Sequence, residues 1–498
     1  MMLTFLSSSL YLALLCTPNF ASASPHNKVQ GPTIKWHSCN EDYSFPSDFQ
    51  CTELEVPVDW KYPKGPKIRL FMNKAPAINL EERIGSLVLN PGGPGGAGST
   101  FLANFAYNNV SGSSVYLREY FDLIGPDPRG TGLSAPIKCD PGLWNQRVSK
   151  QPRTEAAFDS MVAHWRELGL DCMKRTGASF NYSDTISAAH DLEAIRLALG
   201  EGGLNYLGFS YGTQLGSQYA EIFPSNIRSM VLDGATDHSF KKTSFPAVEV
   251  KDYEIVLDHF VEWASTNENS VLKGLNVSAM VDDVFAKAEE APIPAPGCKQ
   301  DSSSSSPCRP NVSGEEMKTI TQEYILQQST WGLLAEGVKE AHQGNATLLS
   351  KPWYTASSST DFSQSAISCQ DWMWNSSWAE WTNRQDLLRS VSPRLQGVSE
   401  VTAAQAVCLG WPSPVVNPEK PLNVTGVSTN ILVVNALFDP ETPYEMAVNL
   451  QTEIEGSVLL TRRGDGHTSY GLHGDTQRAI DNYLVNLTLP GVGTIYDT

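Results

Sequence analysis

The stretch Asn205-Tyr206-Leu207-Gly208-Phe209-Ser210-Tyr211-Gly212-Thr213 contains the pattern Gly-x-Ser-x-Gly, which is typical of a nucleophile elbow. In such an elbow a sharp turn from a strand into a helix holds the serine in strained geometry, with its hydroxyl exposed at the top of a sheet. Gly208 and Gly212 suit this turn because a side chain at either place would collide with the neighbouring strand or helix. We therefore take Ser210 as the candidate nucleophile; the alternative is an ordinary glycine-rich turn.

The segments around this motif have the patterns that an elbow requires. Residues 188–199 place apolar side chains at helical spacing, and the glycines within 200–203 end that helix. Residues 204–209 form a short apolar run that predicts a buried strand, and residues 214–222 predict a helix that ends before Pro224. Strand, turn and helix follow one another, so the context favours the elbow over a chance match.

The composition is that of a globular protein with room for a large core. Its 498 residues suggest two or three domains, or one domain with a large insertion, and its hydrophobic content is 41%. The net charge of −18 argues against binding to nucleic acid or to an anionic membrane surface, because both are themselves negative. We therefore expect neither nucleic acid nor a membrane among the partners, and the composition leaves the oligomeric state open.

The first 23 residues have the pattern of a secretory signal peptide. Leu3–Leu14 is an apolar run broken by serines, and Ala21-Ser22-Ala23 fits a small-residue cleavage site, although the start carries no Lys or Arg. No later stretch has about 18 consecutive apolar residues, so no membrane span is expected. These features predict a secreted, extracellular protein. Eight candidate glycosylation sequons agree with export: Asn109, Asn181, Asn276, Asn311, Asn345, Asn375, Asn423 and Asn486.

The cysteines predict a disulfide framework. There are nine, and removal of the signal peptide with Cys16 leaves an even number in an oxidising compartment. Eight cysteines allow roughly a hundred pairings, and free buried thiols are the alternative. No Cys-x-x-Cys or His-x-x-x-His pair occurs, so we expect no metal site, and we expect no cofactor. Pairing of nearest neighbours gives Cys39–Cys51, Cys139–Cys172, Cys298–Cys308 and Cys369–Cys408.

A glycine-rich loop directly follows a second predicted buried strand. Gly85–Asn90 is predicted as the strand and Pro91–Ser99 as the loop, whose glycines let the backbone approach a ligand closely. One interpretation is an oxyanion hole, in which Gly93 and Tyr211 each supply one backbone N–H. A phosphate loop would need a Gly-Lys-Ser/Thr ending, which the loop lacks, and the other alternative is a flexible turn.

The nucleophile needs a base, and the base needs a carboxylate to orient it. In α/β-hydrolases these follow the serine in the order Asp or Glu, then His. Asp439 follows one predicted strand and His467 follows the next, so both should lie at the same edge of the sheet as Ser210. We assign Ser210 as nucleophile, His467 as general base and acid, and Asp439 as the residue that orients His467. The competing candidates are Asp233, Asp465 and His473.

The order of elements predicts an α/β-hydrolase fold with a large insertion. Strands alternate with helices on both sides of the middle of the chain, which implies a mostly parallel sheet with helices on both faces. The middle is instead helical, Trp-rich and interrupted. We predict a signal peptide at 1–23, the first part of the core at 24–237, an inserted cap at 238–427, and at 428–498 the second part of the core, with the Asp and His of the triad.

Together these motifs resemble those of the proline iminopeptidase and tripeptidyl aminopeptidase family of secreted serine exopeptidases. The resemblance implies a cap that restricts entry and acidic residues that bind the free α-amino group of the substrate. Candidates for the amine site are Glu441, beside Asp439, and Asp371, which could instead be a carboxylate beside a disulfide. The matching segments, in the family's order, are Asn90–Ser99, Asp127-x-Arg129-Gly130-x-Gly132-x-Ser134, Gly208–Thr213, Asp439-Pro440-x-Thr442-Pro443 and Gly464-x-Gly466-His467.

The resemblance predicts a secreted serine aminopeptidase that works through an acyl-enzyme. It would release a short N-terminal unit, a tripeptide or a single residue such as proline, from peptides with a free N-terminus. A secreted esterase or lipase, a serine carboxypeptidase, and a non-catalytic binding protein on the same scaffold are the alternatives. The intact Ser, Asp and His argue against the last, and the Gly-Gly-Pro-Gly-Gly turn argues against the carboxypeptidase.

Overall fold

The computed structural model describes residues 34–39, 43, 45–106, 115–300 and 307–497. The predicted signal peptide at 1–23 and the sequon at Asn109 lie outside these ranges. No helix within them is both long and apolar enough to cross a membrane.

One large sheet forms the base of the molecule, as the sequence predicted. From β5 to β12 neighbouring strands run parallel, while β1, β2 and β3 join at one side in antiparallel pairs. In the described chain ten strands follow the order β1 (His37–Ser38), β2 (Gln50–Pro57), β3 (Lys67–Ala75), β5 (Phe121–Pro126), β4 (Gly85–Asn90), β6 (Leu204–Phe209), β7 (Ile227–Asp233), β10 (Leu432–Phe438), β11 (Val458–Asp465) and β12 (Ile495–Asp497).

Helices cover both faces of this sheet and bury its apolar side chains. All residues of β4 and β6 are buried, as expected for central parallel strands. One face packs on α5 (Thr185–Leu199), α6 (Tyr211–Ile222) and α14 (Tyr444–Glu453). The other face packs on α1 (Gly98–Phe105), α2 (Val115–Tyr120) and α15 (Asp475–Asn486).

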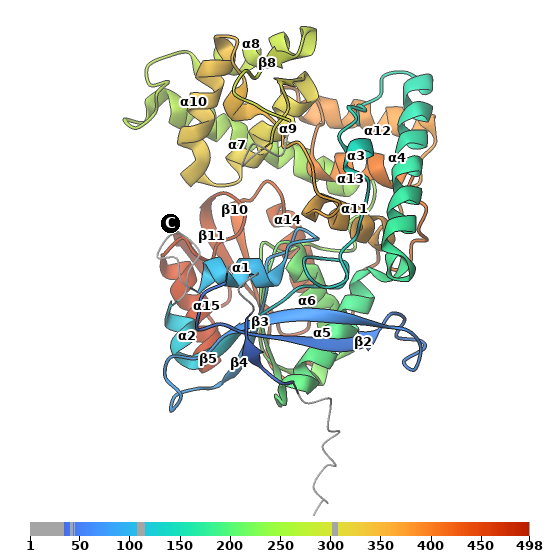
Figure 1. Ribbon diagram of the computed structural model, residues 1–498. Coiled ribbons are helices and arrows are strands. Elements are labelled where there is room, and N and C mark those ends of the chain that lie inside the picture. The colour runs from blue at the N-terminus through green and yellow to red at the C-terminus, as the bar shows by residue number, and fades with distance from the viewer. Residues whose placement is uncertain (1–33, 40–42, 44, 107–114, 301–306, 498) are drawn as a thin grey trace, which may run out of the picture.

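A helical layer lies above the carboxyl edge of the sheet (Figure 1). It is the region predicted as a cap, and it has its own apolar core, in which Phe260 and Trp331 are almost fully buried. A two-stranded ribbon, β8 (Ile293–Pro294) with β9 (Asn311–Val312), joins two of its helices. The helices are α7 (Ser244–Thr266), α8 (Val277–Glu290), α9 (Gly314–Ile325), α10 (Trp331–His342), α11 (Thr360–Asp371), α12 (Trp378–Val391) and α13 (Glu400–Cys408).

Two helices from the first part of the chain pack with this layer. They are α3 (Pro141–Trp144) and the long α4 (Glu155–Thr176), whose Trp165 belongs to one apolar cluster with Phe362 and Trp381 of the cap. Figure 1 shows α4 standing beside α12 and α13. The boundaries 24–237, 238–427 and 428–498 stay predictions, and we propose to count α3 and α4 with the cap.

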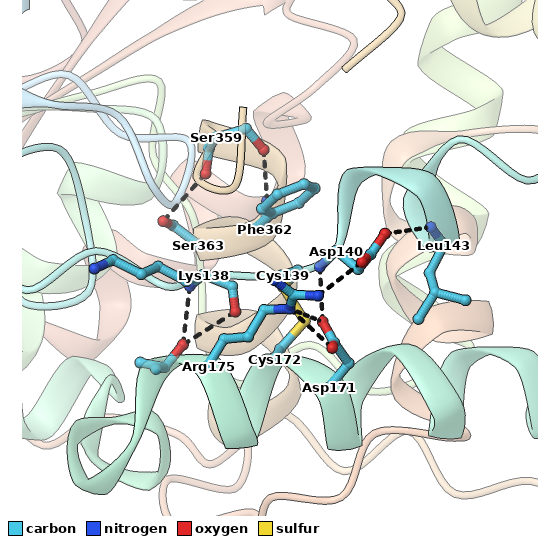
Figure 2. The surroundings of a disulfide bond; sticks show 11 residues. Lys138, Cys139, Asp140, Leu143, Asp171, Cys172, Arg175, Ser359, Phe362 and Ser363 are labelled. Carbon is cyan, nitrogen blue, oxygen red and sulfur yellow. Dashed lines mark hydrogen bonds and ion pairs between the residues drawn. A yellow bond between two sulfur atoms is a disulfide. The ribbon is translucent and has the colours of Figure 1, made fainter. Parts of the chain in front are cut away.

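The four predicted disulfides are all present: Cys39–Cys51, Cys139–Cys172, Cys298–Cys308 and Cys369–Cys408. Figure 2 shows how the second fastens the chain before α3 to α4. Beside it, Arg175 forms ion pairs with Asp171 at 2.8 Å and Asp140 at 2.7 Å. The disulfide and the Arg175–Asp140 ion pair therefore both join the chain before α3 to α4.

The described sequons differ in accessibility. Asn276, Asn375, Asn423 and Asn486 are exposed, whereas Asn181, Asn311 and Asn345 are half-buried. The exposed four could accept a glycan without rearrangement of the fold. Glycosylation stays a prediction.

Candidate active site

Ser210 occupies the sharp turn between β6 and α6. Its backbone has φ 56° and ψ −129°, and positive φ at a non-glycine residue costs roughly 1–3 kcal/mol and is concentrated at functional sites. Its N–H donates to the carbonyl of Asp233 at 2.9 Å, and its carbonyl accepts from the N–H of Thr213 at 2.8 Å. A Cβ at Gly208 would lie 2.6 Å from the carbonyl oxygen of Gly212, so this crossing requires glycine. The turn has the geometry of a nucleophile elbow.

The glycine-rich turn after β4 lies directly against the elbow. A Cβ at Gly92 would lie 2.4 Å from the carbonyl oxygen of Phe209 and 2.8 Å from the Cβ of Ser210. With φ +88°, Gly92 also has a backbone conformation that favours glycine. The turn thus reaches the start of α6, where Gly93 and Tyr211 are expected to form the oxyanion hole. That role of the two N–H groups stays a prediction.

Asp439 and His467 meet on the loops that follow β10 and β11. Nδ1 of His467 lies 2.9 and 3.0 Å from the two carboxylate oxygens of Asp439. The fully buried Asp439 also accepts hydrogen bonds from the N–H and hydroxyl of Thr442, both at 2.9 Å. Burial raises the pKa of Asp439, but the charge of His467 and the hydrogen bonds outweigh burial and lower this pKa overall. Asp439 therefore stays ionised beside the imidazole.

Gly234 lies between the ring of His467 and the backbone that supports the turn at Ser210. It follows Asp233, whose carbonyl accepts the N–H of Ser210. A Cβ at Gly234 would lie 3.2 Å from Cε1 of His467, so the ring lies against the backbone that supports the elbow. The structure thus gathers Ser210, Asp439 and His467 at one edge of the sheet.

The surroundings of His467 predict where activity is lost in acid. Burial lowers the pKa of His467, but the carboxylates of Asp439, Asp233 and Glu400 together raise it by more. The base must be neutral to accept the serine proton, so kcat/KM should fall as the pH drops through this raised pKa, above about 6.5. A pH profile of kcat/KM on a peptide amide measures the midpoint. A midpoint below about pH 6 would show that burial dominates instead.

Glu441 lies against the other nitrogen of the ring. Its Oε2 is 3.0 Å from Nε2 of His467. Because Nε2 has no hydrogen bond within the described residues, the carboxylate approaches it out of line with the N–H direction. Burial raises the pKa of Glu441 to about 7, with Asp439 and Glu249 adding to it. Burial and Glu441 in turn raise the pKa of Glu400 well above its ordinary value.

A cavity of about 680 Å³ adjoins this carboxylate cluster. Ligand sites typically have volumes of about 300–1,000 Å³, so a short peptide segment could enter. Glu441 comes from the core, and most of the other walls come from the cap and the segment before α4. The lining includes Lys150, Tyr253, Glu323, Asp361, Gln364, Glu400 and Glu441.

Asp371, the second candidate for the substrate amine, lies behind the elbow. It is fully buried at the end of α11, and it accepts hydrogen bonds from the N–H of Thr185 at 3.0 Å and from Asn417 at 2.9 Å. Its other oxygen contacts the hydroxyl of Thr185, which lies 2.5 Å from the hydroxyl of Tyr211. Both oxygens are thus occupied within the protein. Binding of the substrate amine by Asp371 stays a prediction. The observed hydrogen bonds do not favour it.

Sequence reasoning missed the residues that hold the histidine loop in place. The buried side chain of Arg462 donates to three backbone carbonyls between residues 465 and 468. The carboxylate of Asp233 accepts the N–H groups of Ser469 and Tyr470 at 2.7–3.0 Å. Asp233, a competing candidate for the triad, therefore holds backbone on the far side of His467. Nothing in the sequence pattern around Arg462 indicates this role.

The other competing candidates also have different surroundings. Asp465 lies 2.5 Å from Nδ1 of His259, on α7. His473 is exposed at the surface. Neither makes the contact with His467 that Asp439 makes, so the geometry favours Asp439 as the orienting carboxylate.

The Asp-x-Arg-Gly motif braces the core next to the site. Buried Asp127 accepts the N–H groups of Ser99, at the start of α1, and of Leu133. Arg129 forms a buried two-bond ion pair with Asp191 of α5, both bonds being 2.6 Å long. These residues position the loops around the elbow and have no visible part in the chemistry.

An elbow serine, followed by an acid and a histidine on loops after later strands, defines the class of serine hydrolases with the α/β-hydrolase fold. Comparison with known families agrees. The family described as alpha/beta hydrolase fold matches residues 85–266, and the family described as TAP-like protein matches residues 396–495. The predicted fold is confirmed, and the chain is a serine hydrolase.

Relatives identify the family within this class. The chain is 31% identical over 475 residues to a tripeptidyl aminopeptidase of Streptomyces lividans, covering 92% of this chain and 84% of that protein. It is 29% identical to serine protease Hip1 of Mycobacterium tuberculosis, covering 93% and 91%. It is 28% identical to a carboxylesterase B of Mycobacterium tuberculosis, covering 94% and 91%. The chain belongs to the tripeptidyl aminopeptidase family of serine peptidases, as its motifs predicted.

Proposed function

We propose that this protein is an aminopeptidase that releases tripeptides from the free N-terminus of peptides through an acyl-enzyme. The observation that carries the proposal is the carboxylate Glu441 in contact with the catalytic histidine, beside a cavity beneath the cap. A triad alone would suit any serine hydrolase. A negative site next to the triad suits a substrate with a positive end, and the named relative in Streptomyces lividans supports the release of three residues.

In this mechanism the hydroxyl of Ser210 attacks the carbonyl of the scissile bond. His467 takes the serine proton through Nε2 and then gives it to the leaving amine. Asp439 holds Nδ1 and stabilises the imidazolium that forms. The N–H groups of Gly93 and Tyr211 would stabilise the oxyanion, and each such donor contributes on the order of 10²–10³ in rate. Water then releases the acyl group by the same steps.

The amine end of the substrate would lie among Glu441 and Glu400. A buried ammonium needs carboxylate partners, because an unpaired buried charge is costly. Burial raises the pKa of both carboxyl groups, to about 7 for Glu441, because it desolvates their ionised forms. A substrate ammonium would be a positive partner for them, and the cavity would hold the residues between it and the serine.

N-acetylation of the substrate should lower kcat/KM by at least about 100-fold, because it removes the charge and leaves buried carboxylates unpaired. Mass spectrometry of the products from free and N-acetylated copies of one peptide library measures this effect. We expect tripeptides from the free library. Equal rates on both libraries would leave the triad in place and remove the aminopeptidase function.

An esterase is the second candidate, because one relative is named carboxylesterase B. A short acyl ester carries no ammonium and makes no use of Glu441. If the protein is an esterase, its kcat/KM on such an ester will exceed that on a tripeptidyl ester of the same alcohol. Under our proposal the tripeptidyl ester is preferred.

We also propose that the protein is secreted. The four disulfides support an oxidising compartment. Detection of the chain, cleaved after Ala23, in the culture medium of its source organism would test this. Detection of the full-length chain inside the cell alone would contradict it.

A further inference from the structure

The backbone of the catalytic histidine is held by the cap. The N–H of His467 donates to the carbonyl of Leu326 at 2.8 Å, and the side-chain amide of Gln327 donates to the carbonyl of His467. Both cap residues belong to the segment 326–328, which follows α9 and which we call the cap turn. Both polar groups of the His467 backbone therefore bind the cap turn, whereas side chains of the core hold the backbone on either side of it.

The cap turn fits closely against the residue that precedes the histidine. A Cβ at Gly466 would lie 2.6 Å from the carbonyl oxygen of Leu326 and 3.7 Å from the Cα of Gln327. Gly466 also has φ +102°, a backbone conformation that favours glycine. The glycine next to His467 in the sequence motif thus lets the cap approach the histidine loop.

The cap turn is in turn fixed within the cap. Ile325 before it is fully buried, and Trp331 after it donates from its indole N–H to the carbonyl of Ile325 at 3.2 Å. Thr330 closes the turn, because its N–H and its hydroxyl both donate to the carbonyl of Gln327, at 3.0 and 2.7 Å. The packing of the cap therefore sets the position of the groups that hold the histidine.

Helix α7 of the cap makes two further contacts with the loops that carry the triad. The ring of His259 packs edge-on against Phe438, which precedes Asp439, with the ring centroids 4.8 Å apart. The same ring lies 2.5 Å from the carboxylate of Asp465, two residues before His467. Helix α7 and the cap turn therefore both hold the loops of the acid and the histidine from the cap side.

We propose that Gln327 is a positioning residue, which together with the carbonyl of Leu326 aims the imidazole of His467 at the nucleophile. Asp439 holds the ring only at Nδ1, so the ring can pivot about this contact unless its backbone is also held. A displacement of about 1 Å in a catalytic group can cost about 100-fold in rate. The cap therefore completes the general base in addition to covering the site. This inference rests on the triad of the proposed function and not on its amine site.

The test compares Gln327→Met with the unaltered enzyme. Methionine keeps the length of the side chain and lacks the donor, so the carbonyl of His467 loses its partner. One probe is a tripeptidyl amide. The other is a small neutral alkyl fluorophosphonate, which needs the base to react with Ser210 but is too small to fill the cavity. We expect kcat on the amide and the rate constant of inactivation to fall together by about tenfold, with KM within about twofold.

The extent of labelling separates a misplaced base from a damaged fold. Where the base is misplaced, every molecule still reacts with the phosphonate, only more slowly, so mass spectrometry should find one label per chain at completion. A partly unfolded variant would keep the original rate in its folded fraction and leave the rest unlabelled, and that result would overturn the proposal. A loss confined to the amide would also overturn it, because Gln327 would then act on the substrate.

Gln328→Met is the matched control. Gln328 is the next residue of the cap turn and has the same side chain, but its amide donates to the carboxylate of Asp465 at 3.1 Å. Both rates should stay within about twofold of those of the unaltered enzyme. Equal losses in the two variants, or no loss in Gln327→Met, would overturn the inference and leave the proposed function standing. If the phosphonate did not label Ser210 in the unaltered enzyme, the proposed function itself would fail.

Discussion

Ser210→Ala is expected to lower kcat/KM on a tripeptidyl amide by about 10⁴- to 10⁶-fold, because the acyl-enzyme can no longer form. Alanine keeps the Cβ and the backbone of the elbow. The backbone hydrogen bonds of the turn to Asp233 and Thr213 do not use the hydroxyl, so they should remain. We therefore expect an unaltered unfolding midpoint together with the loss of activity. Steady-state kinetics and thermal unfolding of the purified variant measure the two quantities.

Ser217→Ala is a matched control for this variant. Ser217 lies on α6, the helix that follows the elbow; it is buried and donates to the carbonyl of Gln214 at 3.1 Å. Its substitution removes a serine hydroxyl close to the site without changing the elbow. Activity should stay within about threefold of the unaltered enzyme. Residual activity of Ser210→Ala within tenfold of the unaltered enzyme would remove Ser210 as the nucleophile.

The core of the site could be predicted because its parts are local in sequence or fixed by strand ends. The glycines around Ser210 are required by the turn itself, and the structure shows backbone within 2.6–2.8 Å of where their side chains would be. Asp439 and His467 follow adjacent parallel strands, whose ends must share one edge of the sheet. The nearest-neighbour disulfides also agree, since each joins segments that are close along the chain.

The substrate side of the site could not be predicted, because it is assembled by tertiary packing. Glu400 enters the site only because α13 packs against α11 and α4 within the cap. No motif around Glu400 indicates this, since its neighbour Ser399 serves as an N-cap. The reverse holds for Asp371: its sequence context suggests a site residue, but the fold buries it behind α6. The attachment of α4 to the cap likewise depends on Trp165 and its partners.

Some helix and strand boundaries differ from the prediction, because the N-cap residue of a helix or a very short strand was overlooked. Helix α5 begins at Thr185, three residues before the predicted start, because Asp184 accepts the N–H of Ser187. The two-residue strand β1 pairs with β2 at the outer side of the sheet and is too short to be recognised in the sequence. Strand β12, at Ile495–Asp497, is too short for its alternation to be noticed. None of these differences moves the candidate triad.

Asp439→Asn should lower kcat/KM by about 10²- to 10⁴-fold, somewhat less than the serine change, because Asp439 orients rather than attacks. Asparagine keeps the shape of the carboxylate, but its NH₂ group would face Nδ1 of His467 or the donors of Thr442 and Thr468. Either choice sets two donors against each other or forces the wrong tautomer of the ring. Steady-state kinetics on the tripeptidyl amide measure the loss.

The pH profile of this variant separates orientation from general damage. The charge of Asp439 helps to raise the pKa of His467, so its removal should move the acid limb of the remaining activity to lower pH. Asp465→Asn is the matched control, since Asp465 contacts His259 and is only two residues from His467. The Asp465→Asn variant should lose far less activity, and the acid limb of its pH profile should stay at the same pH. If Asp465→Asn lowered kcat/KM more than Asp439→Asn does, the orienting role would belong to Asp465. The observed contact between Asp439 and His467 would then not be needed for catalysis.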